Sequence, residues 1–244
     1  MTIRTRLVVP CYNEAARLRP GDFLDFLAAR PDAALLFVDD GSTDGTGRIL
    51  AELAARAEGR AEVLTLPRNA GKARAVHEGV AAALAGGSEL VGYWDADLST
   101  PLDAVASFEE TLAALPRVDL VMGARVKLLG RDIQRLATRH YAGRVFATAA
   151  SLVLGLGVYD TQCGAKLFRS RSGVADAFRE PFRSKWIFDV EMLARFVRAV
   201  GPAEAASRIY EFPLLRWRHA PGSKLMPHHT LRAAWDLLLI AIGG

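Results

Sequence analysis

Short apolar runs recur along the first half of the chain, and each has the length and composition of a buried strand. They occupy residues 7–9, 35–38, 63–66, 90–94 and 120–122. Amphipathic patterns separate the runs; after Ser42, for example, Ile49, Leu50 and Leu53 share one helical face. This order predicts an α/β domain with a mostly parallel sheet flanked by helices. In such folds, ligands bind beyond the carboxyl ends of the strands.

The pattern changes after residue 125. A basic helical stretch comes first, followed by a glycine-rich segment at residues 155–164, a helix near residues 188–200 and a strand-like run at residues 208–217. No Pro- or Ser-rich linker separates the two halves, so we expect a single domain over residues 1–228.

Residues 229–244 form an apolar segment of their own. It is shorter than the roughly 20 residues that a helix needs to cross a bilayer. It could be a final helix packed on the core, an interfacial membrane anchor, or the first part of a membrane region. The sequence leaves these alternatives open.

The overall composition is that of a folded protein in a reducing compartment. Hydrophobic residues make up 51% of the 244 residues and charged residues 24%, which argues against disorder. The two cysteines, Cys11 and Cys163, lie far apart and lack the spacing of metal ligands. The first ten residues lack the apolar region of a signal peptide, so we expect the domain in the cytoplasm.

The net charge of +4 favours an anionic partner, and its distribution is more informative than its size. Residues 125–171 contain nine Lys or Arg and only two acids. We find no interleaving of aromatic and basic residues and no nucleic-acid reader motif, so we do not expect a nucleic-acid partner.

A D-x-D sequence, Asp95-Ala96-Asp97, follows one of the expected strands. In extended backbone, side chains at i and i+2 point the same way, so these two carboxylates could hold one Mg²⁺ or Mn²⁺. Such a cation would neutralise a nucleotide diphosphate as it leaves a sugar. A lone D-x-D is weak evidence, and its value depends on the motifs around it.

Two further polar motifs follow expected strands. One is Pro10-Cys11-Tyr12-Asn13-Glu14, and the other runs from Asp39-Asp40-Gly41-Ser42 to Asp44. Short polar side chains at these points could bind ribose hydroxyls and base edges. Taken alone, the second motif could equally be a turn and the N-cap of the following helix.

The three motifs, in this order and spacing, resemble those of family 2 glycosyltransferases, which have the GT-A fold. The resemblance implies that Pro10, Tyr12, Glu14, Asp39 and Asp40 line the nucleoside pocket, and that Asp95, Ala96 and Asp97 bind the diphosphate and the metal. Asn69, Gly71 and Lys72 match a loop on the nucleotide side, where Lys72 could pair with phosphate. The alternative for Lys72 is a solvated lysine at the start of a helix.

The second half resembles the branch of this family that makes polyprenyl- and dolichyl-phosphate sugars. The matching segments are residues 160–168, 188–193 and 222–225, and the resemblance extends over about residues 5–226. It departs from the usual pattern at Ala165, where phenylalanine is expected. The branch implies UDP-glucose as the favoured donor, with GDP-mannose as the alternative.

A phosphate acceptor also agrees with the charge of the second half. A hydroxyl acceptor needs a general base, whereas a phosphate is already an anionic nucleophile and needs cations to position it. Arg131, Arg135 and Arg139 recur every four residues and would form one stripe on a helix. That stripe could also be a solvated face or attract anionic headgroups.

Several polar residues of the second half are candidates for the acceptor side. Arg125 matches a phosphate-binding arginine of the branch, and we expect Arg125 and Lys166 to act in catalysis together with Asp95 and Asp97. Lys224 lies in a Gly-Ser-Lys element that could close on a phosphate. We interpret Asp160, Gln162, Asp189 and Glu191 as ligands of sugar hydroxyls or as partners of these cations; acids at a helix start also stabilise its dipole.

The sequence therefore predicts a metal-dependent, inverting glycosyltransferase that uses a nucleotide-sugar donor and a polyprenyl-phosphate acceptor. We expect peripheral association with the cytoplasmic face of a membrane. Two alternatives remain, an enzyme that acts on a soluble hydroxyl acceptor and a non-catalytic binder of nucleotide or lipid phosphate. The oligomeric state is left open.

Overall fold

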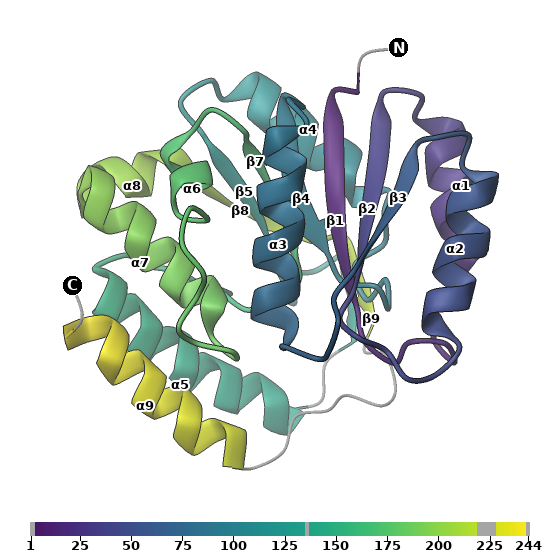
Figure 1. The fold of residues 1–244 in the computed structure, drawn as a ribbon. Helices are drawn as coiled ribbons and strands as arrows, with labels where there is room; N and C mark the ends of the chain where they lie inside the picture. The colour runs from purple at the N-terminus through teal and green to yellow at the C-terminus, as the bar shows by residue number, and fades with distance from the viewer. Residues whose placement is uncertain (1–2, 135–136, 219–227, 243–244) are drawn as a thin grey trace.

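The computed structural model describes residues 3–134, 137–218 and 228–242, and the side chains at 137–142, 228–231 and 234 lie outside this description. A seven-stranded sheet in the order β3-β2-β1-β4-β7-β5-β8 forms the centre (Figure 1). Its strands are β1 (Thr5–Cys11), β2 (Ala33–Asp39), β3 (Ala61–Thr65), β4 (Leu90–Trp94), β5 (Leu120–Ala124), β7 (Ala165–Arg169) and β8 (Ile209–Pro213). The five strands expected from the apolar runs are all present.

The sheet is mostly parallel, as predicted. Strand β1 pairs in parallel with β2 and β4, β2 with β3, and β5 with β8. The exception is β7, which runs antiparallel between β4 and β5 and joins the two halves of the chain into one sheet.

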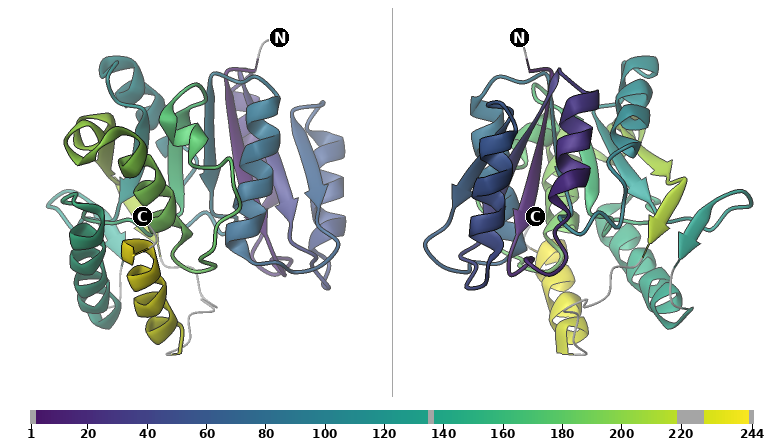
Figure 2. Two further views of the ribbon diagram at one scale, coloured as in Figure 1. Left: turned by 60° about the vertical axis from the view of Figure 1, so that its left-hand side comes forward. Right: turned by 90° about the vertical axis from the view of Figure 1, so that its right-hand side faces the viewer.

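Helices cover both faces of the sheet. Three helices pack on one face, namely α1 (Pro20–Ala29), α2 (Thr46–Arg56) and α4 (Ala104–Ala114). The other face carries α3 (Lys72–Ala85), α5 (Ala137–Leu154), α6 (Gly173–Asp176), α7 (Phe188–Val200), α8 (Pro202–Arg208) and α9 (His228–Ile242). Figure 2 shows these two layers from the side. The helix expected near residues 188–200 is present as α7.

Alternation along β1 sends successive side chains into the two cores. Leu7 and Val9 pack with the α1, α2 and α4 core, whereas Val8 packs with the α3 and α7 core. Helix α3 approaches β1 closely at Gly79, where a Cβ atom would lie 2.3 Å from Val8 Cγ1. Burial of strands on both faces explains why they appear in the sequence as continuous apolar runs.

Two expectations for the second half were wrong. The run at residues 208–217 is not one strand, because it divides into β8 and β9 (Arg216–Arg218), which belong to different sheets. Strand β9 pairs with β6 (Asp132–Gln134), and Arg131 immediately precedes β6. Arg131 is therefore not on the helix that contains Arg139, and the predicted stripe does not form.

The C-terminal segment is helical. Helix α9 packs against α5 and α7, and its Leu237 is buried against them. In the described part of the chain, no helix has both the length and the apolar character needed to span a membrane.

Candidate active site

The three donor-side motifs converge because their strands are neighbours. Strand β1 lies between β2 and β4 in the sheet, and all three strands are parallel. Their carboxyl ends therefore meet at one edge, and this edge carries the segments after Pro10, Asp39 and Trp94. The sheet topology thus brings together the three motifs that follow these strands, at the end of the sheet where ligands of such folds bind.

The segments that follow β1 and β2 hold each other in place. The Asn13 amide donates to Ser42 Oγ at 3.0 Å, and the Thr43 amide donates to Asn13 Oδ1 at 2.9 Å. The Glu14 amide donates to Thr46 Oγ1 at 2.8 Å, at the start of α2. Asn13 has a φ of 49° within this interlock. Pro10, Tyr12 and Glu14 are each partly exposed at the rim of the site, and Glu14 pairs with Arg17 at 2.5 Å.

Asp39 and Asp40 are buried and bond to backbone amides. Asp39 Oδ1 accepts from the Ser42 amide at 3.0 Å. The two Asp40 oxygens accept from the Ala70 and Gly71 amides, each at 2.8 Å. Asp40 thereby fixes the backbone that leads into α3 and presents Lys72 to the site. The N-cap position of α2 is Gly45, with no side-chain cap, so Ser42 and Thr43 do not cap that helix.

Lys72 and Asp95 meet at the centre of the edge. Lys72 Nζ lies 2.5 Å from Asp95 Oδ1, and both side chains keep exposed surface, 42% and 34% respectively. Burial opposes ionisation of the ammonium, but the attraction of Asp95, Asp189 and Asp97 outweighs it, so the pKa of Lys72 is raised. The lysine therefore stays charged beside the acid of the D-x-D.

Gly164 is fitted against Asp95. The Asp95 amide donates to the Gly164 carbonyl at 2.9 Å. A Cβ atom on Gly164 would lie 1.9 Å from Asp95 Oδ2, so a side chain there would displace the carboxylate. This close approach gives a physical reason for glycine at the end of the segment that precedes β7.

The D-x-D lies in a turn. The Leu98 amide donates to the Asp95 carbonyl at 3.1 Å, and Asp97 Oδ1 accepts from the Ser99 amide at 2.9 Å. The extended-strand alternation that we used to align the two carboxylates therefore does not apply beyond Trp94. Both acids still follow the same strand end. Asp97 also lines a cleft of about 980 Å³ that runs along α1 and α4.

Lys166 and Asp189 form a buried ion pair behind this edge. Lys166 Nζ lies 2.6 Å from Asp189 Oδ1 and donates to the carbonyls of Thr161 and Cys163 at 3.0 and 2.8 Å. The Tyr93 hydroxyl donates to the same carboxylate oxygen at 2.5 Å. The lysine side chain has no exposed surface, so this arrangement offers no route for it to contact a phosphate. Lys166 has a structural position instead of the acceptor-binding one that we predicted.

Arg125 is held rigidly at the end of β5. Its Nε and Nη2 atoms donate to the two Asp160 oxygens at 2.6 and 2.7 Å, and its guanidinium lies 5.3 Å from the centre of the Trp217 ring. Asp160 is fixed in turn, because Glu211 accepts from its backbone amide at 2.8 Å. Burial opposes the charge of Arg125 but Asp160 favours it more strongly, so its pKa is raised.

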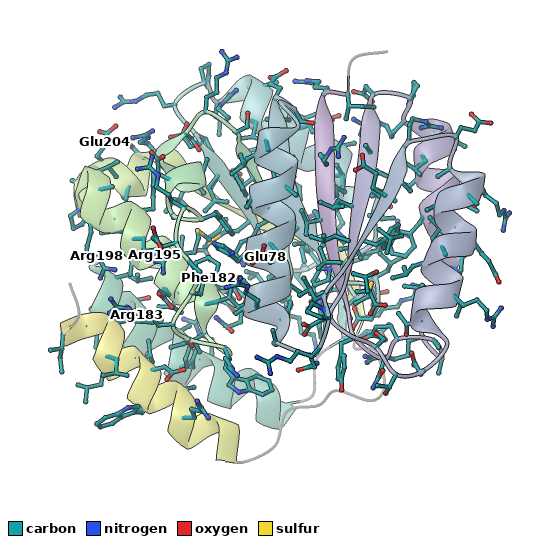
Figure 3. The ribbon with its side chains drawn as sticks, viewed as in Figure 1. Glu78, Phe182, Arg183, Arg195, Arg198 and Glu204 are labelled. Carbon is teal, nitrogen blue, oxygen red and sulfur yellow. The ribbon has the colours of Figure 1, made fainter. Side chains whose placement is uncertain are left out.

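Asp189 and Glu191 lie on helix α7, where residues two apart do not face the same way, so they do not form a joint binding site. Glu191 accepts from the Arg183 and Ser184 amides, each at 2.9 Å, and pairs with Arg195 at 2.8 Å. It therefore fixes the segment before α7 and is buried there. Figure 3 shows Phe182 of this segment between Arg195 on α7 and Glu78 on α3.

The structure brings Lys185 to the site, which sequence reasoning missed. Its Cδ atom lies 4.0 Å from the position of a Cβ atom on Gly71, next to Lys72, and its side chain is exposed. Lys185 directly follows the two residues that Glu191 holds. A lone lysine in a loop has no motif, so only the fold, which places it near Gly71, reveals it. Tyr93 was missed because it lies inside an apolar strand.

The remaining predicted residues are only partly described. The side chain of Arg139 and all of Arg135 and Lys224 lie outside the described residues. Arg131 is partly exposed between β5 and β6, and Gln162 lies in the segment that joins Asp160 to Gly164. Ala96 is buried in the turn between the two D-x-D acids.

The donor set suits a hard divalent cation that shares its ligands with a substrate. Within residues 3–134, 137–218 and 228–242, no group of three or more His, Cys, Asp or Glu side chains could hold a metal ion. Mg²⁺ commonly binds through one or two carboxylates together with substrate phosphates and water. Asp95 and Asp97 suit a site of this kind, shared with a substrate, because two carboxylates are too few for a site made of protein ligands alone.

The chain matches a known family over most of its length. Residues 7–172 match the family described as glycosyl transferase family 2. The chain belongs to this family. It is 31% identical to a dolichyl-phosphate beta-glucosyltransferase of Mus musculus over 258 residues, which covers 99% of this chain and 76% of the mouse protein.

Two further relatives of this family 2 glycosyltransferase are informative. A dolichyl-phosphate beta-glucosyltransferase of Trichomonas vaginalis is 29% identical, covering 98% of this chain and 71% of that protein. A polyprenol monophosphomannose synthase of Mycolicibacterium smegmatis is 30% identical over 169 residues, covering 69% of this chain and 62% of that protein.

The fold is also that of solved glycosyltransferases. Glucosyl-3-phosphoglycerate synthase from Mycobacterium tuberculosis, in complex with Mn²⁺, UDP and glucosyl-3-phosphoglycerate, matches with a TM-score of 0.68 and 20% identity, over 98% of this chain and 80% of that chain. The predicted GT-A fold is confirmed.

Proposed function

We propose that this glycosyltransferase moves a hexose from a nucleotide diphosphate onto a polyprenyl or dolichyl phosphate, with inversion at the anomeric carbon. One observation carries the proposal. A single segment, residues 160–164, contacts both the acid proposed to act on the donor and the arginine proposed to bind the acceptor. Gly164 bonds to Asp95 of the donor side, and Asp160 holds Arg125 on the other. Asp95 and Arg125 are thus held relative to each other by the short segment 160–164.

The donor would bind at the carboxyl ends of β1, β2 and β4. The segments after Pro10 and Asp40 would accept the nucleoside, with Tyr12 and Glu14 at the rim. Lys72 and Lys185 would face the diphosphate, since Lys72 is the first residue of α3 and Lys185, from the segment before α7, lies near it; the dipole of α3 favours anions at this end. Lys72 would exchange its bond with Asp95 for one with phosphate.

Asp95 and Asp97 would hold Mg²⁺ or Mn²⁺ together with the diphosphate. When bound, such a cation supplies Lewis-acid stabilisation of the departing nucleotide. The Mn²⁺ named for the glucosyl-3-phosphoglycerate synthase structure supports this assignment by analogy of fold.

The acceptor would be a phosphate, which needs no general base to attack. Its oxygen would form the new bond to the anomeric carbon while the bond to the nucleotide breaks on the opposite face. Arg125 would position it, because Asp160 and Trp217 hold the guanidinium at a fixed place. Arg131, Arg139 and Lys224 remain proposed contributors to acceptor binding.

UDP-glucose is the proposed donor, and the names of the mouse and Trichomonas vaginalis relatives support glucose. GDP-mannose is a second candidate, because the Mycolicibacterium smegmatis relative is a mannose synthase. We also propose that the enzyme works at the cytoplasmic face of a membrane, where a nucleotide sugar and a lipid phosphate can meet.

A donor screen tests this proposal. The purified protein would be incubated with Mg²⁺, detergent-dispersed polyprenyl phosphate and either UDP-glucose or GDP-mannose, and lipid-linked sugar would be measured. We expect product from UDP-glucose. If product formed only from GDP-mannose, the protein would be a mannosyltransferase. Binding of UDP without any product would favour a non-catalytic binder.

A further inference from the structure

The segment between α6 and α7 exposes a two-residue tip next to the donor side of the sheet. The tip is Lys185-Trp186, and both residues are exposed. The Cδ atom of Lys185 lies 4.0 Å from the position of a Cβ atom on Gly71, the residue before Lys72. A cation on a flexible side chain binds an anion more tightly when the backbone that carries it is held in place. The contacts at the base of the tip therefore matter for what Lys185 can bind.

These contacts converge on Ser184. The Ser184 amide donates to Glu191 Oε2 at 2.9 Å, and Ser184 Oγ accepts from the Ile187 amide at 3.0 Å. The second bond closes a turn that contains only Lys185 and Trp186. Ser184 itself is 4% exposed. The base of the tip is thus buried, although the tip is open to solvent.

A third contact at Ser184 comes from α9, 52 residues further along the chain. The Ser184 hydroxyl donates to Asp236 Oδ2 at 2.7 Å. Helix α9 packs against α5 and α7 (Figure 1), and Asp236 is followed by the buried Leu237. Asp236 is the only acid in residues 228–242, which are mostly apolar. The single carboxylate of this helix is therefore directed at the base of the tip.

The bond to Asp236 orients the Ser184 hydroxyl. A hydroxyl has one proton and two lone pairs, so the partner of its proton fixes where the lone pairs point. A carboxylate is a stronger acceptor than a neutral oxygen, and the proton of Ser184 is directed to it. A lone pair of the same oxygen then faces the Ile187 amide. Without Asp236, the hydroxyl would be free to turn, and the tip would lose part of its support.

We propose that Asp236 is a positioning residue for donor binding. Through Ser184 it would hold the tip so that Lys185 lies beside Lys72 at the start of α3 and contacts the diphosphate. The inference rests on the proposed function, because it takes a nucleotide diphosphate as the ligand of Lys185. It extends that function to a residue of α9, which has no motif and belongs to neither the sheet nor the donor-side loops.

The structure allows this role to be separated from the docking of α9 on the protein. Leu237 is buried in the core between the helices, and Arg198 of α7 donates to the Ile240 carbonyl at 3.5 Å. Both contacts would remain after the substitution Asp236→Ala. Glu191 would also continue to hold the residues before the tip. The substitution should therefore act on the tip and leave the rest of the fold in place.

Calorimetric titration of the full chain with UDP and Mg²⁺, without acceptor, tests the proposal. Lys185→Gln should raise the Kd for UDP roughly fivefold, and Asp236→Ala should raise it about threefold, because it weakens the same contact without removing the cation. The double variant Asp236→Ala, Lys185→Gln should bind UDP like Lys185→Gln alone, since Asp236 acts only through Lys185.

Two further variants separate positioning from a general effect on the fold. Asp236→Asn keeps a side-chain oxygen that can accept from Ser184, so it should bind UDP nearly as wild type does. Ser184→Ala removes the same bond from the other side and should weaken UDP binding at least as much as Asp236→Ala. Arg232→Ala is the matched control, because Arg232 is exposed on the same helix, and its Kd should be unchanged. Circular dichroism would show that each variant is folded.

An unchanged Kd for UDP in folded Asp236→Ala and Ser184→Ala would overturn the proposal, even if both variants melted at a lower temperature. Additive effects of Asp236→Ala and Lys185→Gln would also overturn it, because Asp236 would then act by a route that does not include Lys185.

Transfer from UDP-glucose to detergent-dispersed polyprenyl phosphate by wild type is a separate readout. Transfer by wild type with no change of UDP affinity in the variants would contradict this inference alone. Absence of transfer, with the non-additive effect on UDP binding intact, would contradict the proposed acceptor and leave the positioning role of Asp236 supported. Failure of wild type to bind UDP would contradict both.

Discussion

Two acids in residues 3–124, Asp39 and Asp40, bond to backbone amides, whereas in residues 125–218 Arg125 and Lys166 are each held by an ion pair with an acid. Asp39 and Asp40 each accept from main-chain N–H groups and so shape loops. Arg125 pairs with Asp160 and Lys166 pairs with Asp189, at 2.6 Å in both cases. The first arrangement shapes the loops that follow β2 and β3, and the second joins the end of β5 to the segment before β7 and joins β7 to α7.

This difference shows why a motif residue need not touch a substrate. An acid that fixes a loop can be replaced only by a group with the same geometry, and a buried ion pair resists change because breaking it leaves one charge unpaired. Variants in the two halves should therefore differ in whether they change stability or activity.

Lys166→Met should have the largest effect on stability. It leaves Asp189 buried beside Tyr93 without its cation, so we expect a loss of about 3–5 kcal/mol in the free energy of unfolding. Urea denaturation would measure it. Lys127→Met, at an exposed position, is the control.

The double variant Lys166→Met, Asp189→Asn should recover part of this loss, because it removes the unpaired charge. If Lys166→Met were as stable as wild type but inactive in transfer, Lys166 would contact the acceptor directly, contrary to its burial in the structure.

Asp97→Asn should have the largest effect on activity with little effect on stability. An amide is a poor ligand for Mg²⁺, so kcat should fall by about 10²–10³-fold at saturating donor. The transfer assay would be run with metal concentration controlled, and Glu52→Gln on the surface of α2 serves as the control. Unchanged kcat would remove Asp97 from the site.

Lys185→Gln should have a smaller effect, confined to donor binding. Lys185 is exposed, so loss of its charge should raise KM for the nucleotide sugar roughly fivefold, about 1 kcal/mol, and leave kcat nearly unchanged. Lys185→Arg should restore KM. An effect on kcat alone, or no effect of salt on the difference, would argue against contact with the diphosphate.

His77→Phe should produce the smallest effect, and only in mild acid. His77 is 7% exposed on α3, its ring lies edge-on to Phe182, and neither ring nitrogen makes a hydrogen bond to the described residues, although Nδ1 lies 3.8 Å from Glu78 Oε1. Burial lowers its pKa, with Glu78 opposing and Arg74 and Arg195 assisting. The folded protein therefore takes up this proton less readily than the unfolded chain.

It follows that the contribution of His77 to stability is present above the unfolded pKa of about 6.5 and is lost as pH falls below it. The difference in unfolding free energy between His77→Phe and wild type should grow in favour of the variant from pH 7 to pH 5. A difference that does not change with pH would show that the His77 ring is not buried in neutral form.

The fold and the meeting of the three motifs at one edge of the sheet could be predicted because both depend on local pattern. Residues 90–94 appear as one apolar run because β4 is buried on both faces, and Asp95 follows it directly. The parallel order of the strands then places Asp40 and Asp95 at the same edge. Nothing beyond the alternation of strand and helix was needed for this step.

The structure of the second half could not be predicted in the same way, because its contacts join residues far apart in the sequence. The pairing of β6 with β9 connects residues 132–134 with 216–218, and it removes Arg131 from the expected helix. Whether Lys166 faces solvent or Asp189 depends on β7 running antiparallel inside the sheet. Lys185 and Gly71, which the fold places near each other, are likewise far apart in the sequence.

The most direct test of the central claim compares two acceptors that differ by one phosphate. Transfer of glucose from UDP-glucose would be measured onto polyprenyl phosphate and onto the matching polyprenol, with the anomeric configuration of the product determined by NMR. We predict a β-linked phosphodiester from the phosphate and no product from the alcohol at any pH tested. Transfer to the alcohol with a pH profile that reports an ionisable base, or an α-linked product, would contradict the account.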